Sequence, residues 1–253
     1  MVRVVSTHSF RGGTGKSNLT ANVAVQLAQQ GERVGVVDTD IQSPGIHVLF
    51  GLAGSQVRGA LNDHLFGNRP IGEITHDVTP DGVAGSIHLV PSSVRPGEIS
   101  RVLREGYDAQ RLVQGLRNLV DELGLDSLLI DTHPGLGEET LLALVVSDTV
   151  LIVLRPDQQD YEGTGVVAEV TEGLGVPRRA LVVNKVPATF DPQGVRSRVQ
   201  EAYGAQVVGL LPHDDTMMSL ASAGVFSLRH PEHPLTGAIA EVTEYLLNGE
   251  GAS

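Results

Sequence analysis

A run of glycines and cations near the start of the chain has the residue types needed to hold an anion. It reads FRGGTGKS from Phe10 to Ser17 and follows the β-branched segment 2–6, which is typical of a buried strand. The three glycines let the backbone turn tightly and bring its N–H groups up to a phosphate. Lys16 and Ser17 then begin a helix, whose unpaired N–H groups and dipole favour the same anion. The spacing therefore predicts a phosphate-binding loop in which Lys16 reaches the β- and γ-phosphates and Ser17 binds Mg²⁺.

This loop departs from the common pattern G-x-x-x-x-G-K-[ST], because Phe10 stands where the first glycine is required. The pattern that fits is x-G-G-x-G-K-[ST], with a second cation, Arg11, directly before the glycine pair. A glycine-rich surface turn with an accidental lysine is the alternative. We favour the phosphate loop because strand, loop and helix follow in the required order, with Leu19, Val23 and Leu27 on one apolar face of the helix.

Acidic residues follow two other apolar segments. The run LLID ends in Asp131, which we expect to hold Mg²⁺ through a water while Ser17 binds it directly. Asp38 and Asp40 are spaced two apart, so in extended chain both lie on one side. We assign Asp40 to positioning or activating the attacking water, and Asp38 to the Mg²⁺ shell. The alternative for this pair is a helix cap or turn, because 43–44 indicates a helix start.

The segment that follows Asp131 contains Gly135 and Gly137, beside the expected position of the γ-phosphate. A glycine-flanked loop at that position is able to change shape on hydrolysis, as in other nucleotide switches. His133 lies in the same segment. Because a lone loop histidine is more often structural, we give it no catalytic role.

Strands and helices alternate along the chain, and this order positions the candidate residues. The predicted strands are 2–6, 33–38, 86–91, 128–131, 149–154, 180–184 and 207–211, and most are continuous apolar runs, as expected for strands covered on both faces. Helical patterns lie in the leucine stripe 112–123 and in 138–147, 160–174 and 191–203, while 55–80 is less regular. This order predicts an α/β fold with a doubly wound, mostly parallel sheet flanked by helices. Ligands bind beyond the carboxyl ends of such strands, where the loop and the acids lie. Without a repeat or linker, we expect a single domain over 1–253.

Composition narrows the classes of function. The chain has 253 residues and a formal charge of −12, from 30 acidic and 18 basic residues. Such a surface does not favour non-specific nucleic-acid binding. The absence of cysteine excludes disulfides, thiolate zinc sites and cysteine-ligated iron–sulfur clusters. The chain begins directly with a strand and has no long apolar segment, so we expect no signal peptide, no membrane span and a cytoplasmic location.

Together these residues resemble the deviant phosphate-loop ATPases of the MinD/ParA class, also called SIMIBI-class ATPases. The resemblance covers nearly the whole chain and rests on RGGTGKSN at 11–18, VVDTDIQSPG at 36–45, LLIDTHPG at 128–135, LVVNK at 181–185 and LLPHDD at 210–215. It implies the P-loop NTPase fold, ATP and ADP with Mg²⁺ as ligands, and slow ATP hydrolysis. It also implies a homodimer in the ATP state, with ATP between two subunits, and an activating protein partner.

The resemblance also implies roles for individual residues. In the family a signature Lys before the glycine pair reaches the phosphates of the partner, and here Arg11 occupies that position. Arg keeps the charge and adds a planar fork suited to phosphate, so we expect Arg11 to act in trans. The alternative is that Arg11 pairs with a local acid and the dimer differs. The segment 157–164 is an interface candidate.

The implied set is grouped by role. The catalytic residues are Lys16, Asp40 and Arg11, and the Mg²⁺ residues are Ser17, Asp38 and Asp131. The nucleotide-binding residues are Gly12, Gly13, Thr14, Gly15, Lys16, Ser17, Asn18, Gly135, Asn184, Pro212 and Asp214. By resemblance Asn18 contacts the α-phosphate, while Asn184 and the backbone near Pro212 contact adenine, because an amide offers both a donor and an acceptor.

Branches of the family can be separated by what this chain lacks. Without cysteine, the nitrogenase-iron-protein and iron–sulfur-carrier branches are disfavoured. The stripe Leu235, Ile239, Val242 and Leu246 is interpreted as core, and the tail 248–253 is acidic and glycine-rich, so we expect no membrane-targeting helix. The charge balance predicts no clear DNA-binding surface.

Three functions stay open. The first is an ATP-driven dimerisation switch for intracellular positioning, partitioning or regulation of a cargo or partner protein. The second is a metabolic ATP-dependent ligase or kinase on the same fold. The third is a nucleotide-sensing scaffold with little hydrolysis, which the acids Asp38, Asp40 and Asp131 disfavour.

Overall fold

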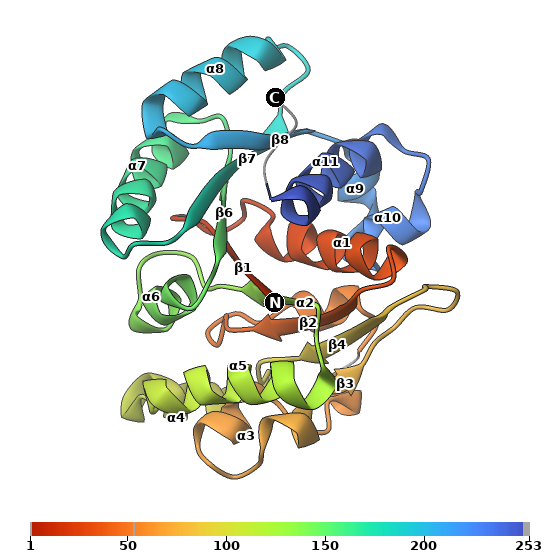
Figure 1. Cartoon of the computed structure of the whole chain (residues 1–253), viewed down its shortest axis with the longest axis vertical. Coiled ribbons are helices and arrows are strands. Elements are labelled where there is room, and N and C mark those ends of the chain that lie inside the picture. Colours follow the sequence, from red (N-terminus) through yellow and green to blue (C-terminus); the bar gives the residue numbers. More distant parts are fainter. Residues whose placement is uncertain (1, 53, 250–253) are drawn as a thin grey trace.

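A computed structural model describes residues 2–52 and 54–249, and within them eight strands form one sheet (Figure 1). The strands are β1 Arg3–His8, β2 Arg33–Asp38, β3 His76–Asp77, β4 Ser86–Val90, β5 Ser127–Asp131, β6 Thr149–Leu154, β7 Arg178–Val186 and β8 Gln206–Pro212. Their order is β3-β4-β2-β5-β1-β6-β7-β8, and every pair is parallel except β3 with β4. The predicted doubly wound, mostly parallel α/β sheet is confirmed.

Helices cover both faces of this sheet (Figure 1). They are α1 Lys16–Gln29, α2 Ile46–Leu49, α3 Leu61–Leu65, α4 Pro96–Glu105, α5 Ala109–Leu123, α6 Glu138–Val145, α7 Gln158–Gly173, α8 Pro192–Tyr203, α9 Asp215–Leu220, α10 Phe226–Arg229 and α11 Pro234–Asn248, with 3-10 turns at Gly54–Gln56 and Ile71–Ile74. Apolar residues of α1, α10 and α11 form one core cluster, while those of α5 and of α7 with α8 form two clusters on the other face.

The central strands contribute alternate side chains to opposite faces. In β5, Leu129 joins the α1 cluster, whereas Leu128 and Ile130 join the α5 cluster. In β7, Val182 and Leu181 divide in the same way between the α1 and α7 clusters. Because both faces are covered, each strand needs apolar residues at successive positions, which is why these strands read as continuous apolar runs.

Differences from the predicted elements have local causes. The predicted strand 2–6 is observed as β1, which begins at Arg3 and extends to His8. The irregular segment 55–80 contains α3 and the antiparallel strand β3, whose two residues are too few to show a periodicity. No prediction was made for α4, a helix in which only Val102 is buried.

The C-terminal stripe behaves as predicted. Leu235, Ile239, Val242 and Leu246 of α11 are all buried in the α1 cluster. Residues 250–253 of the predicted acidic tail lie outside the described residues. Across the described part of the chain, no helix combines the length and the apolar character that crossing a bilayer requires.

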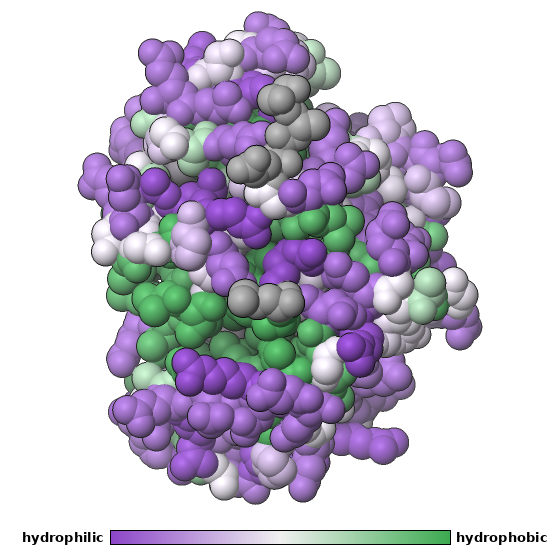
Figure 2. All heavy atoms as spheres, viewed as in Figure 1, coloured by the Kyte–Doolittle hydropathy of each residue, from purple (hydrophilic) through white to green (hydrophobic). Residues whose placement is uncertain are grey.

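An apolar groove lies between α5 and α6 (Figure 2). Its volume is about 650 Å³, and its walls include Leu116 and Val120 of α5 and Leu142 and Val145 of α6, with Val4 of β1 on the floor. Helix α6 ends at Val145 and leaves the start of β1 uncovered. The groove is at the edge where β1 begins, opposite the strand ends that carry the acids.

Candidate functional site

The loop between β1 and α1 has the backbone that its glycines predict. Gly13 and Gly15 adopt left-handed conformations, with φ of 78° and 98°. A side chain at Gly15 would collide with the amide of Asn184, which lies directly against it. Glycine is therefore required at position 15 both by the turn and by the close approach of β7.

Lys16 is buried at the head of α1. Its Nζ donates a hydrogen bond to Ser9 Oγ at 3.0 Å. Burial lowers the pKa of this amine, while the charges of Asp131 and Asp40 act in the opposite direction. An ammonium in this place, beside the N-terminus of a helix, is suited to a phosphate.

Asp38 and Asp131 lie side by side, because they are register partners at the ends of β2 and β5. Both are fully buried, and burial is the main cause of a raised pKa in each. The pKa of Asp131 rises to about 7. For Asp38, the neighbouring carboxylates Asp131 and Asp40 raise the pKa in addition to burial. Two buried acids in contact are costly unless a cation or a proton is shared between them.

Unpaired oxygens indicate what this pair fits. Asp38 Oδ2 and Asp131 Oδ1 are buried and have no hydrogen-bond partner within residues 2–52 and 54–249. The Ser17 hydroxyl is hydrogen-bonded to Asp131. Hard oxygen ligands of this kind suit Mg²⁺, and Ser17, Asp38 and Asp131 are the residues that would hold it. No group of three or more histidine, aspartate or glutamate side chains in the described ranges is arranged to hold a metal alone, so phosphate and water oxygens would complete the shell.

Asp40 is held by neighbours on two segments. Its Oδ1 accepts hydrogen bonds from Ser43 N at 2.9 Å and from His133 Nδ1 at 2.8 Å. The bond from Ser43 is the turn contact that the alternative interpretation of Asp40 expected. The contact with His133 was missed, because no local pattern in the sequence indicates that the segment after β5 reaches Asp40. Gly135 of that segment donates its N–H to Ser9 O at 3.1 Å.

Arg11 and Phe10 both contact α7. Arg11 Nη1 donates to Gln159 Oε1, and Arg11 Nε lies 3.9 Å from Asp160 Oδ1. The Phe10 ring packs against Gly163, where any side chain would collide with it. In the single chain Arg11 therefore has the local acidic neighbour that the alternative interpretation named.

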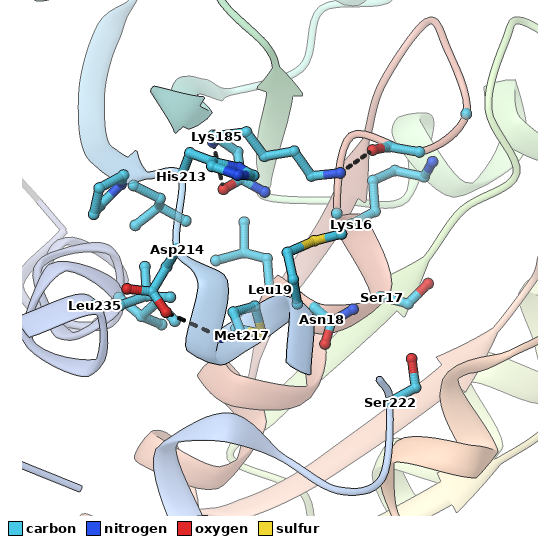
Figure 3. Close-up of a pocket in the computed structure, with 18 of the residues that line it drawn as sticks. Lys16, Ser17, Asn18, Leu19, Lys185, His213, Asp214, Met217, Ser222 and Leu235 are labelled. Atoms are coloured by element: carbon cyan, nitrogen blue, oxygen red, sulfur yellow. Dashed lines mark hydrogen bonds between the residues drawn. The ribbon is translucent and has the colours of Figure 1, made fainter. Parts of the chain in front are cut away.

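Two residues at the end of β7 hold the glycine loop in place (Figure 3). Asn184 Nδ2 donates to Thr14 O at 2.7 Å, and its Oδ1 accepts from Lys185 N at 2.8 Å. Lys185 adopts a left-handed backbone, with φ of 58°, and its Nζ donates to Gly13 O at 2.9 Å. Asn184 keeps one free N–H and one free lone pair for an adenine edge. Lys185 was missed as a site residue, although the chain has two lysines and both line this cavity.

A cavity of about 480 Å³ opens beside the loop (Figure 3). The predicted residues that line it are Gly12, Gly13, Gly15, Lys16, Ser17, Asn18, Asp40, Asn184, Pro212 and Asp214. Arg11, Thr14, Asp38, Asp131 and Gly135 are not part of its lining. We call the glycine loop at this cavity, together with the neighbouring Asp38, Asp40, Asp131 and His133, the loop end. We call the part of the cavity formed by 184–185 and 212–218 the α9 end.

The α9 end combines the predicted Asp214 with apolar side chains that were not predicted. Asp214 caps α9, accepting from Met217 N at 3.0 Å, and its Oδ2 lies 3.6 Å from His233 Nε2. Met217 and Met218 lie on the cavity wall with Leu235 of α11. Flexible, polarizable methionines suit the flat face of a ring. No sequence motif marks them, because α9 and α11 meet here only in the folded chain.

Several arginines outside the cavity make contacts within the chain. Arg178 donates to Gly249 O, and Arg179 donates to Ala168 O and Glu172. Arg196 donates to Val207 O, and Arg101 pairs with Glu105 while lying over the Phe66 ring.

Comparisons with known proteins agree with this architecture. A family model described as AAA domain matches residues 2–174. An uncharacterized ATP-binding protein of Methanocaldococcus jannaschii is 28% identical over 251 residues, which cover 99% of this chain and 89% of the relative. An iron-sulfur cluster carrier protein of Pyrococcus abyssi is 25% identical over 257 residues, which cover 96% of this chain and 85% of the relative.

Solved structures share the fold at lower identity. The MinD cell division protein of Aquifex aeolicus superposes with a TM-score of 0.83 and 20% identity, covering 100% of this chain and 99% of that chain. A MinC:MinD complex from the same organism is also known. The septum site-determining protein MinD of Pyrococcus horikoshii OT3, complexed with Mg-ADP, has a TM-score of 0.81 and 21% identity over 100% of both chains.

Proposed function

Because this chain belongs to the AAA domain family, as a phosphate-loop ATPase of the MinD/ParA class, we propose that it is an ATP-driven dimerisation switch. It hydrolyses ATP slowly, pairs with a second copy in the ATP state, and acts on a cargo or protein partner in partitioning, positioning or regulation. We keep a single domain over 1–253 and a cytoplasmic location as predictions.

The observation that carries the proposal is the loop end itself. Lys16 is buried between Ser9 and the acids at the head of α1, and two buried carboxylate oxygens beside it are unpaired. Burying these charged groups without a ligand costs free energy. A magnesium-bound polyphosphate supplies a cation for the carboxylates and an anion for Lys16. Bound Mg²⁺ would neutralise charge on the phosphate oxygens, with Ser17, Asp38 and Asp131 as its protein side chains.

Hydrolysis needs few further groups. A water attacks the γ-phosphorus, the bond to the bridging oxygen breaks, and ADP leaves with that electron pair. Lys16 stabilises the charge that develops on the phosphate oxygens. Asp40 lines the cavity, which supports its assignment to holding the attacking water. A precedent for the nucleotide is the MinD of Pyrococcus horikoshii OT3, which is complexed with Mg-ADP.

The position of Arg11 supports the proposed dimer. Its side chain is 40% exposed, at the mouth of the loop and on the surface of α7. A guanidinium in that position is able to leave Gln159 and reach the phosphates of a second copy. The candidate interface 157–164 overlaps the first turns of α7, which hold Arg11. A protein partner has a parallel in the MinC:MinD complex of Aquifex aeolicus.

The other functions have less support. A ligase or kinase needs a second pocket with its own catalytic groups, and the other large hollow, between α5 and α6, is lined mainly by apolar residues. A scaffold without hydrolysis does not need Asp40 beside the cavity. The relative from Pyrococcus abyssi is an iron-sulfur cluster carrier protein, but this chain has no cysteine to ligate a cluster.

Solution mass by light scattering tests the proposal, on wild type and Arg11→Ala with Mg²⁺-ATP and Mg²⁺-ADP. We expect the wild type to double its mass with ATP alone and Arg11→Ala to stay monomeric. Arg104→Ala, which removes an exposed arginine of α4, is the matched control and should dimerise. Equal mass in both nucleotides would refute the switch, and equal phosphate release by wild type and Asp40→Ala would remove Asp40 from the mechanism.

A further inference from the structure

His133 contacts Asp40 at hydrogen-bonding distance. His133 follows β5 by two residues, and Asp40 follows β2 by the same number, so the parallel pairing of β2 with β5 brings them together. The Nδ1 to Oδ1 distance is 2.8 Å, and the side chains are 20% and 16% exposed. An ionised carboxylate only accepts, so Nδ1 carries the proton and donates it. The hydrogen bond thus assigns the ring tautomer.

The two oxygens of Asp40 have different surroundings. Oδ1 accepts from His133 Nδ1, from Ser43 N at 2.9 Å and from Ser43 Oγ at 3.2 Å. Oδ2 has one longer contact, with Ser43 Oγ at 3.3 Å. The carboxylate is therefore fixed through Oδ1, and Oδ2 is the oxygen left to accept a proton or a hydrogen bond from water.

His133 is itself anchored. Its carbonyl oxygen accepts a hydrogen bond from Thr140 Oγ1 at 3.2 Å, which ties the segment after β5 to the first turn of α6. Pro134, the next residue, limits the backbone further. A ring held in this way limits the rotation of the Asp40 side chain, which lies on a loop and has no helix or strand to hold it.

We propose that His133 is a positioning residue for ATP hydrolysis: its Nδ1–H fixes Asp40 so that Oδ2 faces the attacking water. The inference rests on the proposed hydrolysis and adds a residue to it. His133 need not touch the nucleotide or the water, because it acts through Asp40.

Three substitutions separate positioning from general packing. Asparagine places an amide N–H close to where Nδ1 was, whereas glutamine places it close to Nε2. We expect kcat to fall about tenfold in His133→Ala and in His133→Gln, with KM for ATP within about twofold, since one charge-assisted hydrogen bond is lost. His133→Asn should recover most of the rate. His88→Gln, at a histidine bonded to Ser86 on β4, is the matched control and should leave the rate unchanged.

A double-mutant cycle and a spectrum complete the test. In an Asp40→Ala background, His133→Ala should have no further effect on kcat, because nothing remains to position. Long-range ¹H–¹⁵N spectra should show the Nδ1-protonated ring in wild type and lose it in Asp40→Ala. These spectra need no turnover.

The outcomes separate the two claims. Equal kcat in all three His133 variants, with an active wild type, would overturn the positioning role and leave the ATPase intact. Absence of hydrolysis by the wild type would overturn both. An Nε2-protonated ring in the wild type would overturn the contact itself, whatever the rates.

Discussion

At the loop end of the cavity, Asp38 and Asp131 are fully buried beside the buried Lys16, and each carries an unpaired oxygen. At the α9 end, Asp214 is partly exposed and satisfied as the cap of α9, and His213 is exposed. The first region concentrates charge that the protein's own side chains do not fully neutralise. The second has its polar groups paired already and offers mainly shape.

Because of this difference, we expect the loop end to contribute mainly to ligand binding and the α9 end mainly to the stability of the fold. Groups at the loop end are at rigid strand ends and a helix start, so they are held in a geometry that favours a ligand and disfavours the free protein. Groups at the α9 end stabilise their own turn and helix. We therefore expect substitutions at the loop end to raise the stability of the free protein while lowering its affinity for nucleotide. Substitutions at the α9 end should lower both stability and affinity modestly.

The largest expected effect sharpens this comparison through the two lysines. Lys16→Ala should lower ATP hydrolysis by about 100-fold or more, because it removes a buried, preorganised charge from the phosphates. Lys185→Ala removes the same amine from the α9 end and should weaken nucleotide affinity only by roughly threefold to tenfold. Phosphate release and titration with a fluorescent ADP analogue measure the two effects. Equal losses in both variants would break the comparison.

The next effect is on stability and pH. Asp131→Asn should stabilise the nucleotide-free protein by about 2 kcal/mol at pH 8, since it removes a buried charge and its amide can donate to Asp38. Wild-type Asp131 has its pKa raised from 3.8 to about 7, so its contribution to stability is complete below pH 4 and is lost as the pH rises through about 7. The advantage of the variant should therefore vanish toward pH 4.

Thermal unfolding at pH 4, 6 and 8 measures this prediction, and Mg²⁺-dependent nucleotide binding should be lost in the same variant. Asp126→Asn is the control, at an exposed acid directly before β5, at the end of the strand opposite Asp131; the pKa of Asp126 is lowered, chiefly by a hydrogen bond from the Arg33 backbone. It should bring no stabilisation at pH 8. A destabilised Asp131→Asn protein at pH 8 would contradict the idea of stored repulsion at the loop end.

The smallest effect concerns the backbone of Lys185. Its left-handed conformation is tolerated by Asn and Gly, so Lys185→Asn and Lys185→Gly should change the unfolding free energy by about 1 kcal/mol or less. Lys185→Val should cost more, because a β-branched residue resists positive φ. Thermal melts of the three variants measure this order. If Val is tolerated as well as Gly, the conformation is not a constraint on the α9 end.

The two ends also differ in how far the sequence predicts them. The sequence predicted which residues meet at the loop end, because Gly13, Gly15, Lys16 and the acids follow strands and the strand ends meet at one edge. The α9 end was predicted only where resemblance supplied Asn184, Pro212 and Asp214. Met217, Met218 and Leu235 reach the cavity through packing of α9 against α11, which leaves no local pattern.

The same reasoning applies to the fold. Strands covered on both faces were predicted from their apolar runs, whereas α4 and β3 were not, because one is almost entirely exposed and the other has two residues. His133 shows the limit for the site. Its residue type was noticed, but the distance to Asp40 depends on the pairing of β2 with β5, which no local pattern specifies.

The contact between Arg11 and α7 bears on the protein concentration at which two copies would pair. In the proposed dimer, a second copy must compete for Arg11 with Gln159 and Asp160, which hold the guanidinium and are always present in the same chain. Competition of this kind lowers the apparent affinity by the fraction of chains in which the arginine is free. The strength of one local contact therefore sets the threshold concentration for pairing, and a change at position 159 would shift that threshold without touching the nucleotide.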